Sequence, residues 1–206
     1  NSLRSWNFFD LPKSVSSASN VGGFGIDGDV SALTGASLAN RGKLFFGVVG
    51  DLAFFYDMNV LGNRHIGNNL RIMLVNNGKG SEFRLYSHRA TRFGEDTEKY
   101  IAAAGHFGKK SRTLVKHFAQ DLGFEYLCAS NKREFEKVYE RFLVPEITER
   151  PMLFEVFTNS SDESDALEII RNLEGNLEET IRARTKNAAK RILGRRGVDI
   201  IKKVTD

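Results

Sequence analysis

Cysteine is almost absent from this chain. The 206 residues include a single cysteine, Cys128, so no disulfide can form within the chain. Cys128 ends an apolar, strand-like stretch, where a lone cysteine usually acts as a small buried hydrophobic residue. We therefore expect a fold without covalent cross-links, and a reducing cytoplasm fits this composition.

Long apolar runs are also missing, since none approaches the ~20 residues that a membrane-spanning helix needs. No basic-then-apolar leader opens the chain, which begins at Asn1 rather than Met. We expect no membrane segment and no signal peptide, and we interpret the chain as a fragment of a longer protein. With 41% hydrophobic and 27% charged residues, its composition is typical of a globular domain.

The sequence also lacks a basic surface that could bind a polyanion. The net charge of +4 is concentrated in residues 178–206, which carry nine Lys or Arg and four acidic residues. The remaining residues together have a net charge of −1. A basic tail alone is a weak signal, so we expect no nucleic-acid partner.

Apolar runs alternate with amphipathic segments along the rest of the chain. Buried strands are predicted at 44–49, 70–75, 124–128 and 152–157. Helices are predicted at 29–40, 57–66, 96–104, 111–122 and 131–143, with a loop over 78–94. This alternation predicts an α/β fold, with a mostly parallel sheet covered by helices on both faces as a three-layer α/β/α sandwich.

The pattern changes after residue 158. Residues 159–165 predict a polar linker, followed by a helix at 166–173 and a basic helix at 177–193. We therefore divide the chain into a domain at 1–158 and a linker with a basic helical extension at 159–206. The basic helix fits two interpretations, a solvated helix packed along the domain or a docking helix for another part of the full protein.

Polar residues follow the first two strands at a characteristic spacing. Gly50-Asp51-Leu52 ends the first strand, and Asn77 comes 26 positions after Asp51, at the end of the second. Carboxyl ends of parallel strands share one edge, where open α/β sheets bind ligands. Carboxylate, amide and carbonyl oxygens suit Mg²⁺ or Ca²⁺ shared with a substrate's phosphates. The alternative is structural, a capping aspartate with a turn-forming Asn-Gly.

A second motif points elsewhere. Residues 23–28 read Gly-x-Gly-x-x-Gly before a predicted helix, and Asp51 follows about 23 residues later, so the dinucleotide-binding fingerprint is formally met. Its context argues against it, because the preceding SVSSASNV is too polar for a buried first strand. A dinucleotide-dependent oxidoreductase therefore stays a weaker alternative.

Three sequence blocks in order, at 19–28, 50–59 and 76–80, resemble the signature of thiamine diphosphate enzymes. They are most similar to the diphosphate-binding domain of the menaquinone-pathway synthase family, over roughly residues 1–158. That family decarboxylates 2-oxoglutarate and adds the product to isochorismate. The resemblance implies the thiamine diphosphate-binding fold, with thiamine diphosphate and Mg²⁺ as cofactors.

The resemblance also implies a set of site residues. Metal ligands would be Asp51, the side-chain oxygen of Asn77 and the backbone carbonyl of Lys79, a position where the family usually has glycine. Ile26 matches the apolar residue that bends the cofactor, and Gly50, Leu52 and Ala53 would offer backbone N–H groups to the diphosphate. The full cofactor-binding set is Ile26, Gly50, Asp51, Leu52, Ala53, Asn77, Lys79 and Gly80.

The resemblance implies that this chain is one part of an enzyme. We expect a 2-oxo acid decarboxylase or carboligase, a lyase or transferase, whose activating glutamate lies in a pyrimidine-binding domain of the same or a partner subunit. The isolated chain would then be inactive, and the full-length form a homodimer or homotetramer. The alternative is a non-catalytic binding or regulatory module of the same fold. Near the loop, His88 or His106 is a candidate for proton transfer, and Phe83 for lining the pocket.

One departure from the family yields a prediction about substrate. Val21 stands where the family has an arginine of its carboxylate-binding set, and valine offers neither charge nor donor. Trp6 occupies the place of a second such arginine, with Arg4 two positions early. We predict that the full-length enzyme prefers a smaller or less anionic 2-oxo acid or acceptor. The measurement is kcat/KM on 2-oxoglutarate with isochorismate against pyruvate and other short 2-oxo acids; a highest value on the first pair contradicts it.

Overall fold

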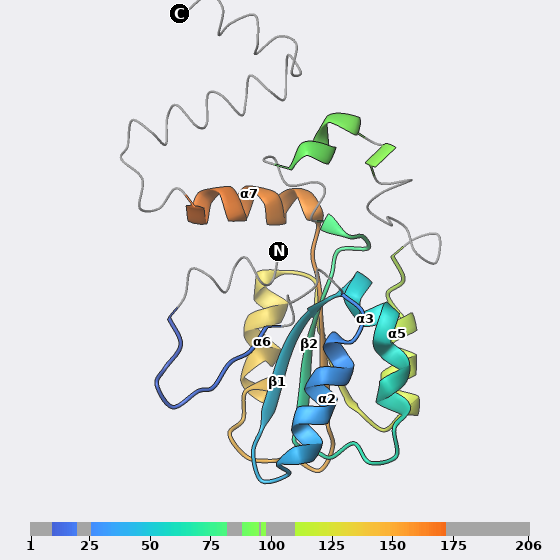
Figure 1. The fold of residues 1–206 in the computed structure, drawn as a ribbon, viewed down its shortest axis with the longest axis vertical. Helices are drawn as coiled ribbons and strands as arrows, with labels where there is room; N and C mark the ends of the chain where they lie inside the picture. The colour runs from blue at the N-terminus through green and yellow to red at the C-terminus, as the bar shows by residue number, and fades with distance from the viewer. Residues whose placement is uncertain (1–9, 20–25, 82–87, 95, 98–109, 172–206) are drawn as a thin grey trace, which may run out of the picture.

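A four-stranded parallel sheet forms the centre of the protein in a computed structural model that describes residues 10–19, 26–81, 88–94, 96–97 and 110–171 (Figure 1). The strands lie in the order β1-β2-β4-β3. Their bounds are Phe45–Gly50 for β1, Leu70–Asn76 for β2, Glu125–Ala129 for β3 and Met152–Phe157 for β4. All four were predicted from their apolar runs, to within one residue at each end.

The register of the strands decides which residues meet at the sheet's carboxyl edge. Gly50 pairs with Val75 across β1 and β2, and Asn76 pairs with Phe157 across β2 and β4. The next residues along the chain, Asp51, Asn77 and Thr158, therefore leave neighbouring strands at one edge. Polar side chains separated by many residues in the sequence are brought together there.

Helices account for most of the remaining described residues. Those before β2 in the chain are α2 (Asp29–Ala39), α3 (Asp51–Asp57) and the 3₁₀ turn η1 (Met58–Gly62). Those after it are η3 (Arg89–Phe93), α5 (Leu114–Asp121), α6 (Lys132–Phe142) and α7 (Ser160–Arg171). The predicted cap of α6 is confirmed, because the Asn131 side chain accepts a hydrogen bond from the backbone N–H of Glu134.

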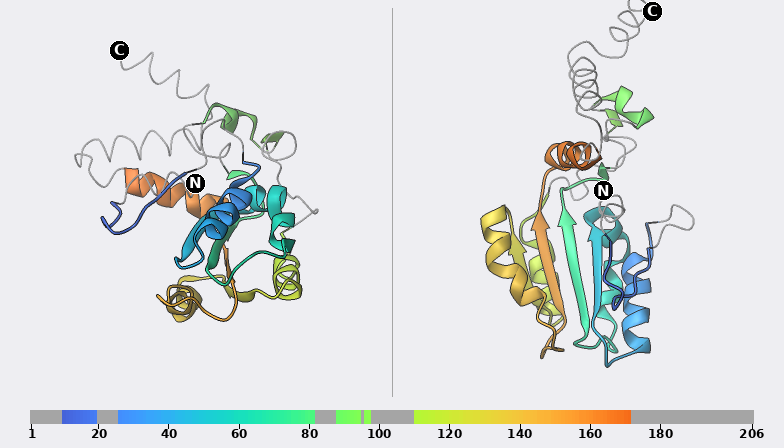
Figure 2. Two further views of the ribbon diagram at one scale, coloured as in Figure 1. Left: turned by 60° about the horizontal axis from the view of Figure 1, so that its bottom comes forward. Right: turned by 90° about the vertical axis from the view of Figure 1, so that its left-hand side faces the viewer.

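Two apolar clusters show that the sheet is covered on both faces. Ile72 and Leu74 of β2 pack with Val30 of α2, Phe54 of α3 and Val115 of α5. The other face holds a second cluster in which Phe154 of β4 and Met73 of β2 meet α6 through Phe135, Val138, Tyr139 and Phe142. The right-hand view of Figure 2 shows α6 and α2 on opposite sides of the sheet. The predicted three-layer α/β/α sandwich is therefore confirmed.

Three expectations from the sequence are corrected by the structure. The helix expected at 57–66 begins at Asp51, directly after β1, and ends as the turn η1; His65 lies in the turn that follows. Cys128 is exposed rather than buried, on a strand that pairs only with β4 among the described residues. The expected linker at 159–165 is helical from residue 160 onward.

Local capping explains the early start of α7. The Asn159 side chain accepts hydrogen bonds from the N–H groups of Ser161 and Asp162, and acidic residues in the first turn favour a helix N-terminus. Most of the helix expected at 96–104, and the basic helix expected at 177–193, lie outside the described residues, as do Arg4, Trp6, Val21, Phe83 and His106.

A buried arginine ties the opposite, amino-terminal end of the sheet to α6. Arg71 of β2 is fully buried, and its guanidinium donates hydrogen bonds to the backbone carbonyls of Phe142, Val144 and Glu146. Its charge also lies 5.3 Å from the ring centroid of Phe46. These carbonyls belong to the end of α6 and the segment after it, where backbone acceptors lack helical partners. Arg71 is thus the one charged residue of β2, and it caps this end of α6.

We predict that Arg71→Met lowers the free energy of unfolding by about 3 kcal/mol or more, since three carbonyls lose a charged donor at roughly 1 kcal/mol or more each. Arg41→Met is the matched control, because Arg41 donates one exposed hydrogen bond to the His65 carbonyl. Its effect should stay within about 0.5 kcal/mol. The measurement is urea denaturation; equal stability of the two variants would contradict the assigned role of Arg71.

Candidate active site at the carboxyl edge of the sheet

Asp51 links the ends of β1 and β2. It is the first residue of α3, and only 2% of its surface is exposed. One carboxylate oxygen accepts a hydrogen bond from the backbone N–H of Gly78 at 2.5 Å, and the other accepts one from Leu52 at 2.9 Å. A carboxylate has about four lone-pair positions, so a single side chain can bond backbone groups at the ends of two strands.

The segment after β2 is a tight turn stabilised by its own side chains. The Asn77 side-chain oxygen accepts a hydrogen bond from the N–H of Lys79 at 3.0 Å, which is an Asx turn. Gly78 has φ +83°, a left-handed conformation that side chains rarely adopt. A Cβ at Gly78 would also come within 3.1 Å of the Lys110 Cβ, so glycine is favoured there for two reasons.

Helix α7 lies across this edge of the sheet, above the strand ends (Figure 1; Figure 2, right). Its residue Glu163 accepts hydrogen bonds from the Asn77 side-chain nitrogen at 3.1 and 2.9 Å, one for each carboxylate oxygen. Thr158 donates to the same carboxylate at 2.5 Å and Ser81 at 3.4 Å. The segment that the sequence suggested was a linker thus supplies a carboxylate to the candidate site.

Lys110, in the segment that precedes α5, also belongs to the candidate site. The Lys110 ammonium donates a hydrogen bond to the Thr158 carbonyl at 2.8 Å, directly after β4. Burial lowers the pKa of Lys110, and nearby Arg112 lowers it further, whereas the carboxylates of Asp51 and Glu163 act in the opposite direction. The site therefore combines partly buried charges of both signs, and a phosphate group would meet a cation there.

A network of buried polar side chains stabilises the turn that follows β2, on the side of the sheet interior. Glu155 of β4 is fully buried and accepts hydrogen bonds at 2.6 Å from the Asn76 side-chain nitrogen and at 2.6 Å from the Tyr126 hydroxyl. The Asn76 side-chain oxygen in turn accepts from the N–H of Gly78 at 3.2 Å. Burial raises the pKa of Glu155, which the two hydrogen bonds oppose, and it also raises the pKa of Tyr126.

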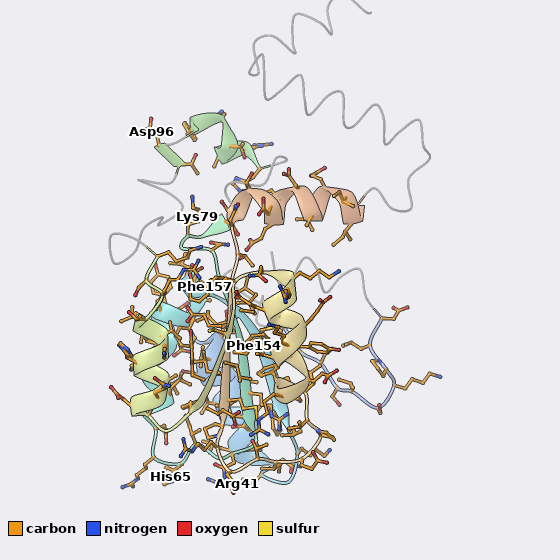
Figure 3. All side chains as sticks on the ribbon, turned by 180° about the vertical axis from the view of Figure 1, so that it is seen from behind. Arg41, His65, Lys79, Asp96, Phe154 and Phe157 are labelled. Carbon is orange, nitrogen blue, oxygen red and sulfur yellow. The ribbon has the colours of Figure 1, made fainter. Side chains whose placement is uncertain are left out.

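The structure brings some of the predicted residues together. Asp51 and the turn of Asn77 are joined through Gly78, and Gly50, Leu52 and Ala53 lie at the start of α3. The N–H of Leu52 is already bonded to Asp51. Figure 3 labels Lys79 beside α7, at the opposite end of the molecule from Arg41 and His65. Gly80 directly follows Lys79 in this turn.

For the remaining candidate site residues, the positions in the fold do not show a functional role. Ile26 precedes α2 and is 40% exposed. His88 caps η3, since its ring nitrogen Nδ1 accepts a hydrogen bond from the N–H of Ala90. Proton transfer by His88 is an expectation that these contacts do not test.

The residues present fit a magnesium-diphosphate group. Asp51 provides a buried hard carboxylate at the end of one strand, and Asn77 provides an amide oxygen at the end of the next. Within the described ranges no three His, Cys, Asp or Glu side chains gather as a metal site. The predicted set uses a different chemistry, with one carboxylate, one amide oxygen and the backbone carbonyl of Lys79.

Comparison with known proteins identifies relatives over most of the chain. The 2-succinyl-5-enolpyruvyl-6-hydroxy-3-cyclohexene-1-carboxylate synthase of Bacteroides fragilis is 34% identical over 165 residues, covering 80% of this chain and 28% of that enzyme. The enzymes of that name from Bacteroides thetaiotaomicron and Phocaeicola vulgatus are 34% and 35% identical, with the same coverage. This chain therefore spans little more than a quarter of these relatives. No protein-family model matches the sequence.

Among solved structures, a thiamine diphosphate-dependent 4-hydroxybenzoylformate decarboxylase of Rhodococcus jostii RHA1 superposes with a TM-score of 0.44 at 21% identity. The alignment covers 64% of this chain and 23% of the decarboxylase. A likeness at this level carries no argument about function.

The class follows from the sequence relatives, which are thiamine diphosphate-dependent enzymes. Within that class, the chain belongs to the family of the 2-succinyl-5-enolpyruvyl-6-hydroxy-3-cyclohexene-1-carboxylate synthases. In the described part of the chain, no helix combines the length and hydropathy needed to cross a bilayer.

Sequence reasoning missed three residues of this edge. Glu163 was assigned to a polar linker, and Lys110 and Glu155 were given no role. A signal existed for Glu155, because a charged residue inside the apolar run of β4 needs partners when buried. The helix-capping Asn159 followed by acidic residues was the signal that could have placed Glu163 on a helix near the site.

The buried carboxyl group of Glu155 predicts a pH dependence of stability. Because its pKa is raised in the folded state, the unfolded state binds fewer protons above the ordinary pKa of 4.5. The stabilisation is thus complete below that value and decreases as pH rises toward the folded pKa. We predict that the stability of the parent relative to Glu155→Gln falls as the pH rises above 4.5 in urea denaturation. Parallel pH profiles would contradict it.

Proposed function

We propose that this chain is the diphosphate- and Mg²⁺-binding domain of a thiamine diphosphate-dependent 2-oxo acid decarboxylase or carboligase. The supporting observation is the hydrogen bond between the Asp51 carboxylate and the Gly78 N–H, which holds the two expected metal-binding segments together. Asp51, Asn77 and the Lys79 carbonyl would hold the cation, and the backbone around Gly50, Ala53 and Gly80 would face the diphosphate. Ile26 would contact the cofactor.

The proposed cofactor would supply the carbanion chemistry that 2-oxo acid decarboxylation requires. This chain's contribution is to bind the diphosphate, orient it through the cation and keep the charged groups partly away from water. Lys110 adds a cation that neutralises negative charge beside Asp51. The relatives' substrates become candidates for the full protein, together with the shorter 2-oxo acids that Val21 favours.

The proposal includes a partner. The chain spans 28% of the relatives' length, and the resemblance assigns the activating glutamate to a pyrimidine-binding domain of the same or another subunit. We therefore infer that the complete cofactor site forms in a homodimer or homotetramer of the full protein, and that the isolated chain does not turn over 2-oxo acids. The alternative, a binding module without turnover, has the same cofactor contacts and differs only in lacking activity with that domain.

Thiamine diphosphate binding by the chain should depend on Mg²⁺ or Ca²⁺ and should be lost in Asp51→Ala, because the diphosphate then lacks its bridging cation. Isothermal titration calorimetry with and without the metal measures this. Asp51→Asn separates two roles of the side chain, since its amide oxygen can still accept a hydrogen bond from Gly78 while the charge is gone. We expect Asp51→Asn to fold like the parent and to lose metal-dependent binding.

The exposed Asp162 provides the control, and Asp162→Ala should bind like the parent. Cofactor binding by Asp51→Ala as tight as that of the parent, with the metal present, would show that the carboxylate serves only the turn. Thermal denaturation of each variant excludes unfolding as the cause of lost binding.

A further inference from the structure

The side chain of Asn77 is held from both ends. Its nitrogen donates to the two carboxylate oxygens of Glu163 at 3.1 and 2.9 Å, and its oxygen accepts from the N–H of Lys79 at 3.0 Å. Glu163 lies on α7, 86 residues further along the chain, so the contact is set by the fold rather than by the turn itself. An ionised carboxylate only accepts hydrogen bonds.

Because the carboxylate of Glu163 can only accept hydrogen bonds, it determines the orientation of the Asn77 side-chain amide. An amide group that rotates by 180° about its last bond exchanges its oxygen and nitrogen, and an exposed asparagine has little preference between the two. Beside Glu163, the rotated form would place the amide oxygen against a carboxylate and leave the Lys79 N–H facing an amide nitrogen. The carboxylate therefore favours the rotamer in which the oxygen points away from α7, toward the turn.

We propose that Glu163 is a positioning residue for the metal, which acts through Asn77 by directing its side-chain oxygen toward the cation. The inference rests on the function proposed above, because only a cation at Asp51 and Asn77 gives the amide orientation a purpose. Glu163 itself is not assigned as a ligand. Groups that orient a metal ligand from behind commonly change metal affinity by 10- to 100-fold when they are removed.

The surroundings of Glu163 are built to hold it in place. Thr158, the residue after β4, donates its hydroxyl to one carboxylate oxygen at 2.5 Å, and the buried Ser81 approaches the other at 3.4 Å. The Asn159 cap fixes the first turn of α7, and Leu167 one turn later is buried, with 3% of its surface exposed. A carboxylate held by several donors and a packed helix has little freedom to leave Asn77.

Two neutral substitutions separate hydrogen bonding from charge. Glu163→Met removes the acceptor and keeps a similar size, whereas Glu163→Gln loses the charge and keeps an oxygen that can accept from Asn77. Thiamine diphosphate is titrated into the chain at a series of Mg²⁺ concentrations, and the half-saturating Mg²⁺ concentration is compared. We expect an increase of about 10-fold or more for Glu163→Met. We expect Glu163→Gln to stay within about 3-fold of the parent, like the control Asp162→Asn in the same turn.

Two results of this titration would overturn the proposal. One is a half-saturating concentration for Glu163→Met equal to that of the parent. The other is an equal increase for Glu163→Met and Glu163→Gln, which would assign the effect to charge. If the parent itself shows no metal-dependent binding, the proposed function fails, and the orientation of Asn77 is decided by a second measurement.

That measurement is the NMR signal of the Asn77 side-chain NH₂ group in the cofactor-free chain. Its hydrogens should exchange slowly with water in the parent and in Glu163→Gln, and rapidly in Glu163→Met. Asp162→Asn again serves as the control. Exchange that is the same in all four proteins would show that Glu163 does not hold the amide, whatever the cofactor does.

Discussion

The hydrogen bond from the Gly78 N–H to the Asp51 carboxylate is the interaction on which the arrangement of the site depends. It joins the ends of two strands that are neighbours only because β1 and β2 pair in parallel from Phe45 with Leu70 to Gly50 with Val75. The acceptor is a buried charge, and a buried charge is stable only when its oxygens are bonded. The turn of Asn77 is therefore positioned by the same carboxylate that is proposed to bind the cation.

Around this hydrogen bond, the site contains charged side chains of both signs instead of apolar ones. Lys110 approaches from the segment before α5, Glu163 from α7 and Glu155 from within β4, and each is held by hydrogen bonds to its neighbours. Removing one of these side chains leaves the groups bonded to it without that partner, and an unpaired polar group is costly when it is buried. The far edge of the sheet uses the same principle with Arg71 and three carbonyls.

The strands, and the position of Asp51 and Asn77 at one edge of the sheet, could be predicted because they depend on local pattern: apolar runs define buried strands, and parallel topology places their carboxyl ends together. The contribution of α7 could not be predicted in the same way. Its first turn is polar, and polar residues between periodic segments are typical of a linker. Only the three-dimensional course of the chain after β4 shows that Glu163 turns back over Asn77. The exposure of Cys128 was missed because strand position within a sheet is not readable from a single apolar run.

The geometry of Gly78 has a consequence for how freely this turn can vary between related proteins. Its positive φ and the close approach of Lys110 both disfavour a side chain, so an exchange at this position is costly. The next residue is proposed to act through its main chain alone, and any residue carries the same carbonyl. A lysine can therefore replace the glycine that is usual in the family at position 79 without changing the atom presented to a cation. Within three consecutive residues, the requirement thus changes from a particular side chain at Asn77, to a preference for glycine at Gly78, to a backbone N–H and carbonyl alone at Lys79.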